Sequence, residues 1–152
     1  MKTYKIVPYQ SVGQLIFGME RQEVRYLCGS FKNYPTGFPV ENHSVDDFGY
    51  QHCYYTPDRK LEAVSVFPEV TLQYHDQSII VSEDIQFLLN QLNKIVDDLK
   101  YLEFDESYYS QTLGLMIYCP EDLVENVLIF SEHYYDEENE YLMKHFGVTK
   151  FE

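Results

Sequence analysis

Apolar and polar residues alternate with a period of two through residues 48–67 and 113–130, the pattern of half-buried β-strands. Each stretch is interrupted by Pro followed by an acid, which suits a turn. We therefore predict a β-hairpin in each stretch. A third pair of strands is predicted at residues 70–81, around a His-Asp-Gln turn.

Helical spacing of apolar residues predicts two helices before these hairpins. The first covers residues 21–28 and stops at Gly29. The second covers residues 82–99, with Ser82 as its N-cap and acids in its first turn. A terminal helix is predicted at residues 136–147 because acids begin it and a glycine ends it.

The two predicted hairpins share a sequence motif. The pattern Glu-x-Val-x-(Val or Ile)-Phe recurs at residues 62–67 and 125–130. We predict a single α+β domain of two helix-hairpin (αββ) units, about 12–81 and 82–146, that share one antiparallel sheet of about six strands with the helices on one face. Residues 32–47, rich in Pro and Gly, are expected to form a surface loop.

The segment before the first helix carries a family resemblance. Residues 12–19, Val-Gly-Gln-Leu-Ile-Phe-Gly-Met, lead to a Glu-Val pair and then to Gly29. This opening resembles a broad group of bacterial proteins in which Gly-Met introduces a short helix ending at Gly. Over residues 12–130 the chain resembles the tandem helix-strand-strand architecture of β-lactamase inhibitory protein, and also the cytosolic immunity proteins of bacterial contact-dependent and polymorphic toxin systems. Glu20 departs from the Thr or Ser usual after Gly-Met. The resemblance implies inhibition by occlusion, with no catalytic residues.

The charge of the chain is strongly negative and uneven. Lys and Arg number 11 against 25 Asp and Glu, giving a formal net charge of -14. Most of the excess lies in residues 77–152. This potential repels phosphates and anionic membranes, which argues against direct nucleic-acid or membrane binding and favours a basic protein partner. No apolar run reaches the roughly 18 residues of a membrane span, and no signal peptide is recognised, so we expect a cytoplasmic protein.

The sequence contains none of the common metal, cofactor or catalytic motifs. The adjacent His52 and Cys53 point to opposite faces of a strand, and no zinc, calcium or phosphate-loop spacing occurs, so we predict no metal and no cofactor. Cys28, Cys53 and Cys119 are expected to be free thiols, with Cys53 and Cys119 small buried residues of corresponding strands. Because no nucleophile motif is present either, we predict a protein that is not an enzyme.

Acidic and aromatic residues gather in two clusters, one before and one after the second hairpin. An antiparallel pair of strands would bring both clusters to the same edge of the sheet and form a negative rim with tyrosine anchors. The predicted partner-binding residues are Asp105, Glu106, Tyr108, Tyr109, Glu132, Tyr134, Tyr135, Asp136, Glu137, Glu138, Glu140 and Tyr141.

These features favour an immunity protein that binds and neutralises a cognate basic toxin domain, such as a nuclease, by steric and electrostatic occlusion. The alternative is an acidic DNA mimic or general interaction protein that binds DNA-binding proteins. A small enzyme with a pocket on its sheet is a third class.

Overall fold

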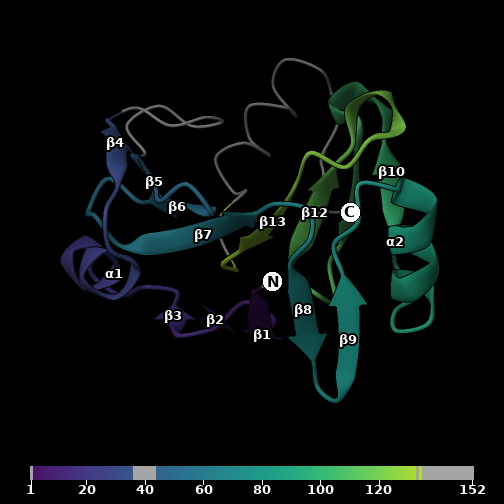
Figure 1. Cartoon of the computed structure of the whole chain (residues 1–152), viewed down its shortest axis with the longest axis horizontal. Coiled ribbons are helices and arrows are strands. Elements are labelled where there is room, and N and C mark those ends of the chain that lie inside the picture. The colour runs from purple at the N-terminus through teal and green to yellow at the C-terminus, as the bar shows by residue number, and fades with distance from the viewer. Residues whose placement is uncertain (1, 36–43, 133, 135–152) are drawn as a thin grey trace.

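The computed structural model describes residues 2–35, 44–132 and 134, which form two β-sheets, two α-helices and two short 3-10 helices (Figure 1). Strands predominate in the described part of the chain. The predicted terminal helix at residues 136–147 lies outside the described residues.

The larger sheet has eight antiparallel strands in the order β10-β11-β12-β13-β7-β6-β5-β4. It consists of a first meander, β4 to β7, and a second meander, β10 to β13, joined where β7 pairs with β13. The strands are β4 Lys32–Tyr34, β5 Val45–Asp47, β6 Gln51–Tyr55, β7 Leu61–Val66, β10 Lys100–Leu102, β11 Ser107–Ser110, β12 Leu115–Tyr118 and β13 Asn126–Phe130.

The repeated sequence motif lies in β7 and β13, the two strands through which the meanders pair. The predicted hairpins are confirmed as β6–β7 and β12–β13. Val66 pairs with Val127 and Val64 with Ile129, so the two copies of the motif run side by side in opposite directions. Each meander therefore places its last strand at the centre of the sheet, where side chains on both faces can be buried.

The smaller sheet has five strands in the order β3-β2-β1-β8-β9. Its strands are β1 Thr3–Val7, β2 Ser11–Val12, β3 Leu15–Ile16, β8 Thr71–Tyr74 and β9 Gln77–Ile80. The β8–β9 hairpin confirms the prediction for residues 70–81. The amino-terminal strand β1 pairs with β8 in parallel, which joins the beginning of the chain to its middle.

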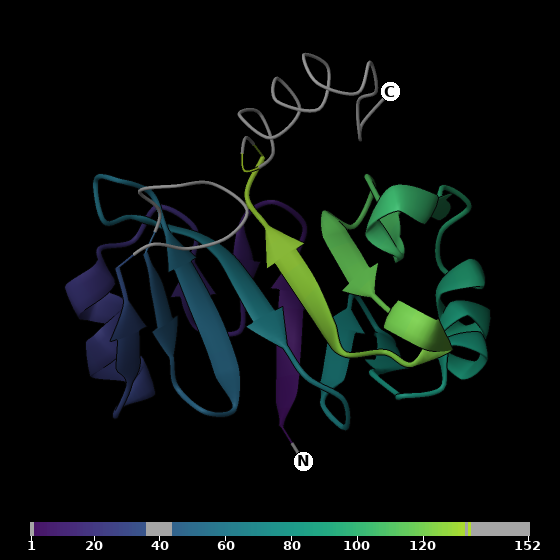
Figure 2. The same ribbon diagram turned by 90° about the horizontal axis from the view of Figure 1, so that it is seen from above.

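The two helices lie at opposite ends of the larger sheet, α1 beside β4 and α2 on the β10 side (Figures 1 and 2). Helix α1, Arg21–Cys28, has the predicted bounds and ends at Gly29, whose φ of 94° favours glycine. Helix α2, Ile85–Asn93, is shorter than predicted. Its N-cap is Asp84, whose carboxylate accepts hydrogen bonds from the backbone of Gln86 and Phe87, so the assignment of Ser82 as the cap is wrong. The 3-10 helices are η1 Glu103–Asp105 and η2 Pro120–Asp122.

The main core lies between one face of the larger sheet and a layer made by the smaller sheet and both helices. It includes Val24 of α1, Leu88 of α2, Leu72 of β8 and Val64 of β7, all buried. The opposite face of the larger sheet carries a second, smaller cluster of buried residues, built around Phe130. Both faces at the centre of the sheet are therefore covered.

The predicted fold class is wrong, because the chain forms two sheets rather than two αββ units sharing one sheet of six strands. Part of the expected loop at 32–47 forms β4 and β5, and residues 3–16 supply three strands of a second sheet. Strands β2 to β5 have only two or three residues each, and β5 carries Asp46 and Asp47, so they lack the period-two pattern of a longer strand. Strand β1 does alternate, with Tyr4 and Ile6 buried between exposed residues.

Among the described residues, no helix has the length and apolar character needed to cross a membrane.

Candidate functional site

Three segments distant in sequence meet at one end of the second meander, and we call them the acidic end: residues 83–84, 103–106 and 119–125. Backbone hydrogen bonds tie them together. The amide of Val124 donates to the carbonyl of Glu83 at 3.0 Å, and the amide of Cys119 donates to the carbonyl of Glu106 at 3.0 Å. A β-bridge between Asp84 and Leu123 adds a further contact. The start of α2 and two loops of the sheet thus form one surface.

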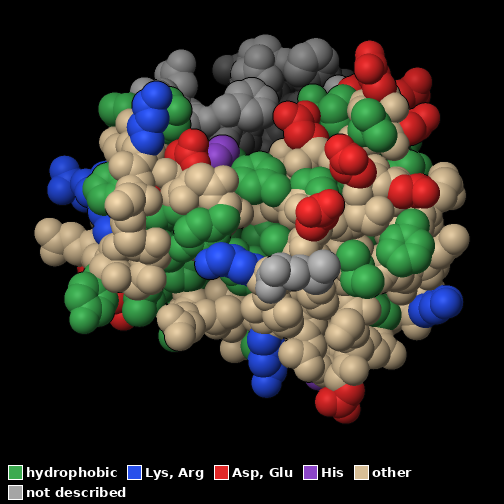
Figure 3. Space-filling view, viewed as in Figure 1, with side chains coloured by type: hydrophobic (Ala, Val, Ile, Leu, Met, Phe, Trp, Pro, Cys, Tyr) green, Lys and Arg blue, Asp and Glu red, His purple; other side chains and the backbone are tan. Residues whose placement is uncertain are grey.

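The acidic end contains carboxylates and no Lys or Arg. Its acids are Glu83, Asp84, Glu103, Asp105, Glu106, Glu121, Asp122 and Glu125. All of them are exposed except Asp105, which is partly buried. The space-filling view shows Asp and Glu side chains gathered at the upper right, over this part of the molecule, with hydrophobic side chains between them (Figure 3). A concentrated negative potential with apolar contacts among the charges suits a basic protein partner.

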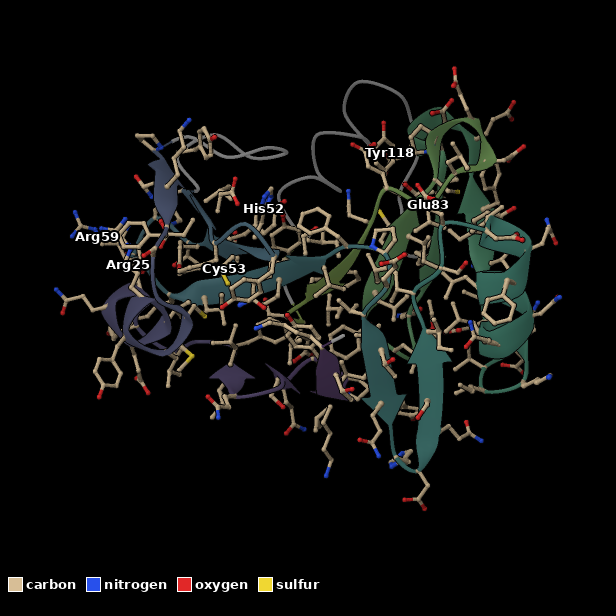
Figure 4. All side chains as sticks on the ribbon, in the orientation of Figure 1. Arg25, His52, Cys53, Arg59, Glu83 and Tyr118 are labelled. Carbon is tan, nitrogen blue, oxygen red and sulfur yellow. The ribbon has the colours of Figure 1, made fainter. Side chains whose placement is uncertain are left out.

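Large apolar side chains stand exposed among these charges. Tyr101 is 50% exposed, Tyr118 36% and Leu123 57%. Desolvation and the carboxylates of Glu125, Glu106 and Asp105 raise the pKa of Tyr118, so its phenol remains a neutral hydrogen-bond donor (Figure 4). An aromatic ring with a polar tip is the kind of residue that dominates binding energy at interfaces.

Three acids of this surface adopt a left-handed backbone conformation. Glu106 has φ 49°, Glu121 φ 55° and Asp122 φ 66°. Such conformations cost of order 1 kcal/mol for a residue other than glycine and recur where a loop must present particular side chains. Local backbone preference therefore does not explain the shape of these loops.

The predicted partner-binding residues fall at different places in the fold. Asp105 and Glu106 lie in the acidic end, and Tyr108 lies next to it in β11, with its ring centroid 4.8 Å from that of Tyr101. Tyr109 and Tyr134 are only 3% and 6% exposed, because both belong to the second core cluster. Both tyrosines are therefore core residues, and neither is accessible as an anchor for a partner.

Glu132 lies beyond the other end of β13 and is therefore not brought to Asp105 and Glu106. It lines a cavity of about 470 Å³ together with Tyr9, Lys60 and Tyr134. The ring of Tyr134 stacks on that of Phe130 at 6.2 Å, which fixes one wall of this cavity. The remaining predicted residues, Tyr135, Asp136, Glu137, Glu138, Glu140 and Tyr141, lie outside the described residues.

Sequence reasoning missed much of the acidic end. The missed residues are Glu83, Asp84, Glu121, Asp122, Leu123 and Glu125, with Tyr101 and Tyr118 beside them. Each acid stands at a helix start or in a turn, where acids are common for purely local reasons. The signal that could have found them is the absence of Lys and Arg from all three segments.

In the first meander, by contrast, a carboxylate is buried and paired. Asp46 of β5 is fully buried and accepts hydrogen bonds from Arg25 at 2.7 Å and 2.9 Å, from Asn33 at 2.9 Å and from Tyr55 at 2.9 Å. Burial opposes ionisation of Asp46, but these hydrogen bonds outweigh it and lower the pKa of the carboxyl. Arg25 also lies over the ring of Phe31, 4.0 Å from its centroid. The carboxylate here joins α1 to the sheet and is a structural residue.

In the described ranges 2–35, 44–132 and 134, no group of three or more His, Cys, Asp or Glu residues is arranged to hold a metal ion. Comparison of the chain with protein-family models, with curated proteins and with solved structures finds no match to any of them.

Proposed function

We propose that this protein is a cytoplasmic immunity protein of a bacterial toxin system, which binds a basic toxin domain and blocks it without catalysis. The observation that supports this most is the acidic end, where eight acids and no Lys or Arg come from three separate segments. The exposed rings of Tyr101 and Tyr118 and the side chain of Leu123 provide apolar contacts within the same surface.

The physical mechanism is electrostatic steering followed by occlusion. A nuclease binds phosphates in a basic cleft, so a surface of carboxylates is attracted to the same cleft. Steering of this kind raises association rates by about 10–10³-fold and is screened by salt. Once the protein is bound, desolvated rings slow dissociation, and the body of the sheet excludes the substrate.

The second candidate is an acidic DNA mimic that occupies the DNA-binding surface of a host protein. The density of carboxylates at the acidic end favours it as well, since these groups stand in for phosphates. The two functions differ in selectivity, because an immunity protein has one cognate partner whereas a DNA mimic binds several unrelated DNA-binding proteins.

The test is co-expression with the product of the neighbouring reading frame, the candidate toxin, with cell growth and inhibition of the purified product as readouts. We expect the wild-type protein to restore growth. The triple variant Glu83→Lys, Glu103→Lys, Glu125→Lys changes one exposed acid in each segment, and it should associate about 10-fold more slowly or worse, with a flatter dependence on salt.

The matched control is Glu23→Lys, Asp58→Lys, Asp76→Lys, which changes the net charge by the same amount at exposed positions outside the acidic end. Equal losses in the two triple variants would contradict the proposed surface. Tight binding of several unrelated DNA-binding proteins, with no effect on the toxin, would support the DNA mimic instead.

A further inference from the structure

Two of the three cysteines lie together on the α1 side of the molecule, away from the acidic end. Cys28 is the last residue of α1 and is partly buried, and Cys53 lies in β6 and is fully buried (Figure 4). Each thiol shifts the pKa of the other, since Cys53 lowers the pKa of Cys28 and Cys28 raises the pKa of Cys53. The sequence predicts Cys53 and Cys119 as small buried residues of corresponding strands, and both are buried. The fold places Cys53 close to Cys28.

A buried glutamine is aimed at both sulfur atoms. The hydroxyl of Tyr4 donates to Oε1 of Gln51 at 2.8 Å, which leaves the Nε2 of Gln51 to face the thiols. Nε2 lies 3.2 Å from Sγ of Cys28 and 3.9 Å from Sγ of Cys53. Gln51 is only 2% exposed, so its amide group is held in this orientation by its partners.

These contacts favour the thiolate form of Cys28. The hydrogen bond from Cys53 is the largest contribution, burial opposes it, and Tyr50, Gln51 and Lys2 add to it, with the result that the pKa of Cys28 is lowered to about 7. The same hydrogen bond and burial raise the pKa of Cys53, which stays a thiol.

A reagent can reach Cys28. Cys28 lines a cavity of about 260 Å³ together with Lys2, Tyr4, Tyr50 and Gln51. The ammonium of Lys2 sits 3.6 Å from the centroid of the Tyr50 ring, at the same cavity. The cavity therefore combines an accessible nucleophilic sulfur, a second sulfur behind it and nearby hydrogen-bond donors.

We propose that Cys28 and Cys53 are a thiol pair that a peroxide oxidises to an intrachain disulfide. The Cys28 thiolate attacks one oxygen of hydrogen peroxide, the O–O bond breaks, and the leaving hydroxide takes up the proton that the Cys28 thiol released to solvent on ionising, which gives water. The product is the sulfenic acid of Cys28. The sulfur of Cys53 then attacks the sulfur of Cys28, the S–O bond breaks, and the hydroxyl departs as water with the proton of Cys53.

Two thiols and one peroxide thus give one disulfide and two waters. Cys28 acts as the nucleophile because it is ionised and accessible, and Cys53 acts as the resolving thiol because it lies behind Cys28 and is protected from solvent. The disulfide would fix the end of α1 to β6 of the first meander. This site does not depend on the acidic end or on the proposed function.

The test begins with the wild-type protein treated with hydrogen peroxide and mapped by mass spectrometry without reduction. We expect loss of two of the three free thiols and a peptide in which Cys28 is joined to Cys53, with Cys119 still reduced. Cys119 is an internal control, because burial raises its pKa and it is only 4% exposed. Three free thiols after treatment, or an intermolecular disulfide through Cys28 with Cys53 still reduced, would overturn the proposal.

Two variants separate the roles of the thiols. Cys53→Ser should accumulate the sulfenic acid of Cys28, trapped as its dimedone adduct, and Cys119→Ser should form the same disulfide as the wild type. Direct conversion of wild-type Cys28 to the sulfinic acid would overturn the assignment of Cys53 as the resolving thiol. Circular dichroism shows whether each variant is folded, and if Cys53→Ser is not, Cys28→Ser replaces it and should leave Cys53 reduced.

The role of Gln51 is tested by the pH dependence of iodoacetamide labelling. Labelling of wild-type Cys28 should be half-maximal near pH 7, whereas ordinary thiols are only a few per cent ionised there. Gln51→Met should move this midpoint to higher pH and slow labelling at pH 7 several-fold. An unchanged midpoint in folded Gln51→Met would show that Gln51 does not activate the thiol.

Discussion

The two meanders of the larger sheet have the same strand order but use carboxylates in opposite ways. In the first meander, Asp46 is buried and held by Arg25, Asn33 and Tyr55. At the end of the second meander, eight acids stand together with no Lys or Arg in their segments, and most are exposed. The first arrangement joins a helix to the sheet, while the second creates a field that extends into solvent.

The comparison indicates that one part of the sheet uses a carboxylate for stability, while another part keeps its carboxylates available for binding. A paired, buried carboxylate is costly to disturb, because removing one partner leaves the other charge buried and uncompensated. A group of exposed like charges destabilises the folded chain slightly through repulsion, and a basic partner relieves that repulsion. Substitutions in the two meanders should therefore affect different measurements.

The largest expected effect comes from breaking the ion pair of the first meander. Asp46→Ala should lower the free energy of unfolding by about 3–5 kcal/mol, because Arg25 loses its carboxylate partner and Asn33 and Tyr55 lose an acceptor. Urea denaturation measures the change. The control is Glu20→Gln, which disrupts the exposed ion pair with Lys60 and should cost at most about 1 kcal/mol. Similar costs in the two variants would mean that Asp46 is not the structural residue described here.

The same ion pair should make stability depend on pH in the acid range. The pKa of Asp46 is lower in the folded chain, so its contribution is present above the pKa of the unfolded carboxyl and is lost as the pH falls through the folded pKa. Below about pH 4, the free energy of unfolding of the wild-type protein should therefore fall more steeply with decreasing pH than that of Asp46→Asn. Parallel urea titrations from pH 7 to pH 2 measure this, and equal slopes in the two proteins would contradict it.

A smaller effect is expected at Asp98, which supports the turn between β11 and β12. Its carboxylate accepts hydrogen bonds from Oγ of Ser110 and from the backbone amide of Thr112, both at 2.7 Å. Asp98→Ala should cost about 1–2 kcal/mol in the free energy of unfolding. The neighbouring exposed residue gives the matched control, since Asp97→Ala should change stability by less than about 0.5 kcal/mol.

The smallest effect on stability is expected at the acidic end, and its sign is opposite. The triple variant Glu83→Lys, Glu103→Lys, Glu125→Lys should raise the free energy of unfolding by about 0.5–1 kcal/mol, because it replaces repulsion with attraction. Thermal and urea unfolding at low salt measure the gain. A loss of several kcal/mol would place these acids among the structural residues and remove the contrast between the meanders.

Part of the fold could be predicted from sequence because some elements carry strong local signals. The bounds of α1 follow from helical spacing and from Gly29, and the hairpins β6–β7 and β12–β13 follow from period-two alternation and a Pro-acid turn. Strands such as β4 and β5 have no such signal. They are stabilised by the hydrogen bonds that Asp46 accepts from side chains of α1, β4 and β6. Because these contacts come from other elements, the local strand propensity of residues 32–47 does not predict them.

The candidate site was predictable only in part for the same reason. Asp105 and Glu106 could be chosen because acids and tyrosines are adjacent in sequence there. Glu83 and Glu125 reach the same surface through the backbone contact between the start of α2 and the loop after β12, which joins segments about 40 residues apart. Adjacency in sequence also selected Tyr109, but strand alternation turns its side chain to the second core cluster.

The central claim is the proposal that a basic partner docks at the acidic end. It is tested most directly by amide hydrogen exchange of the protein alone and mixed with the candidate partner, the product of the neighbouring reading frame. The account predicts slower exchange on binding at residues 83–84, 103–106 and 118–125, with little change in α1. Protection confined to α1 and the first meander, with the acidic end exchanging as in the free protein, would contradict it.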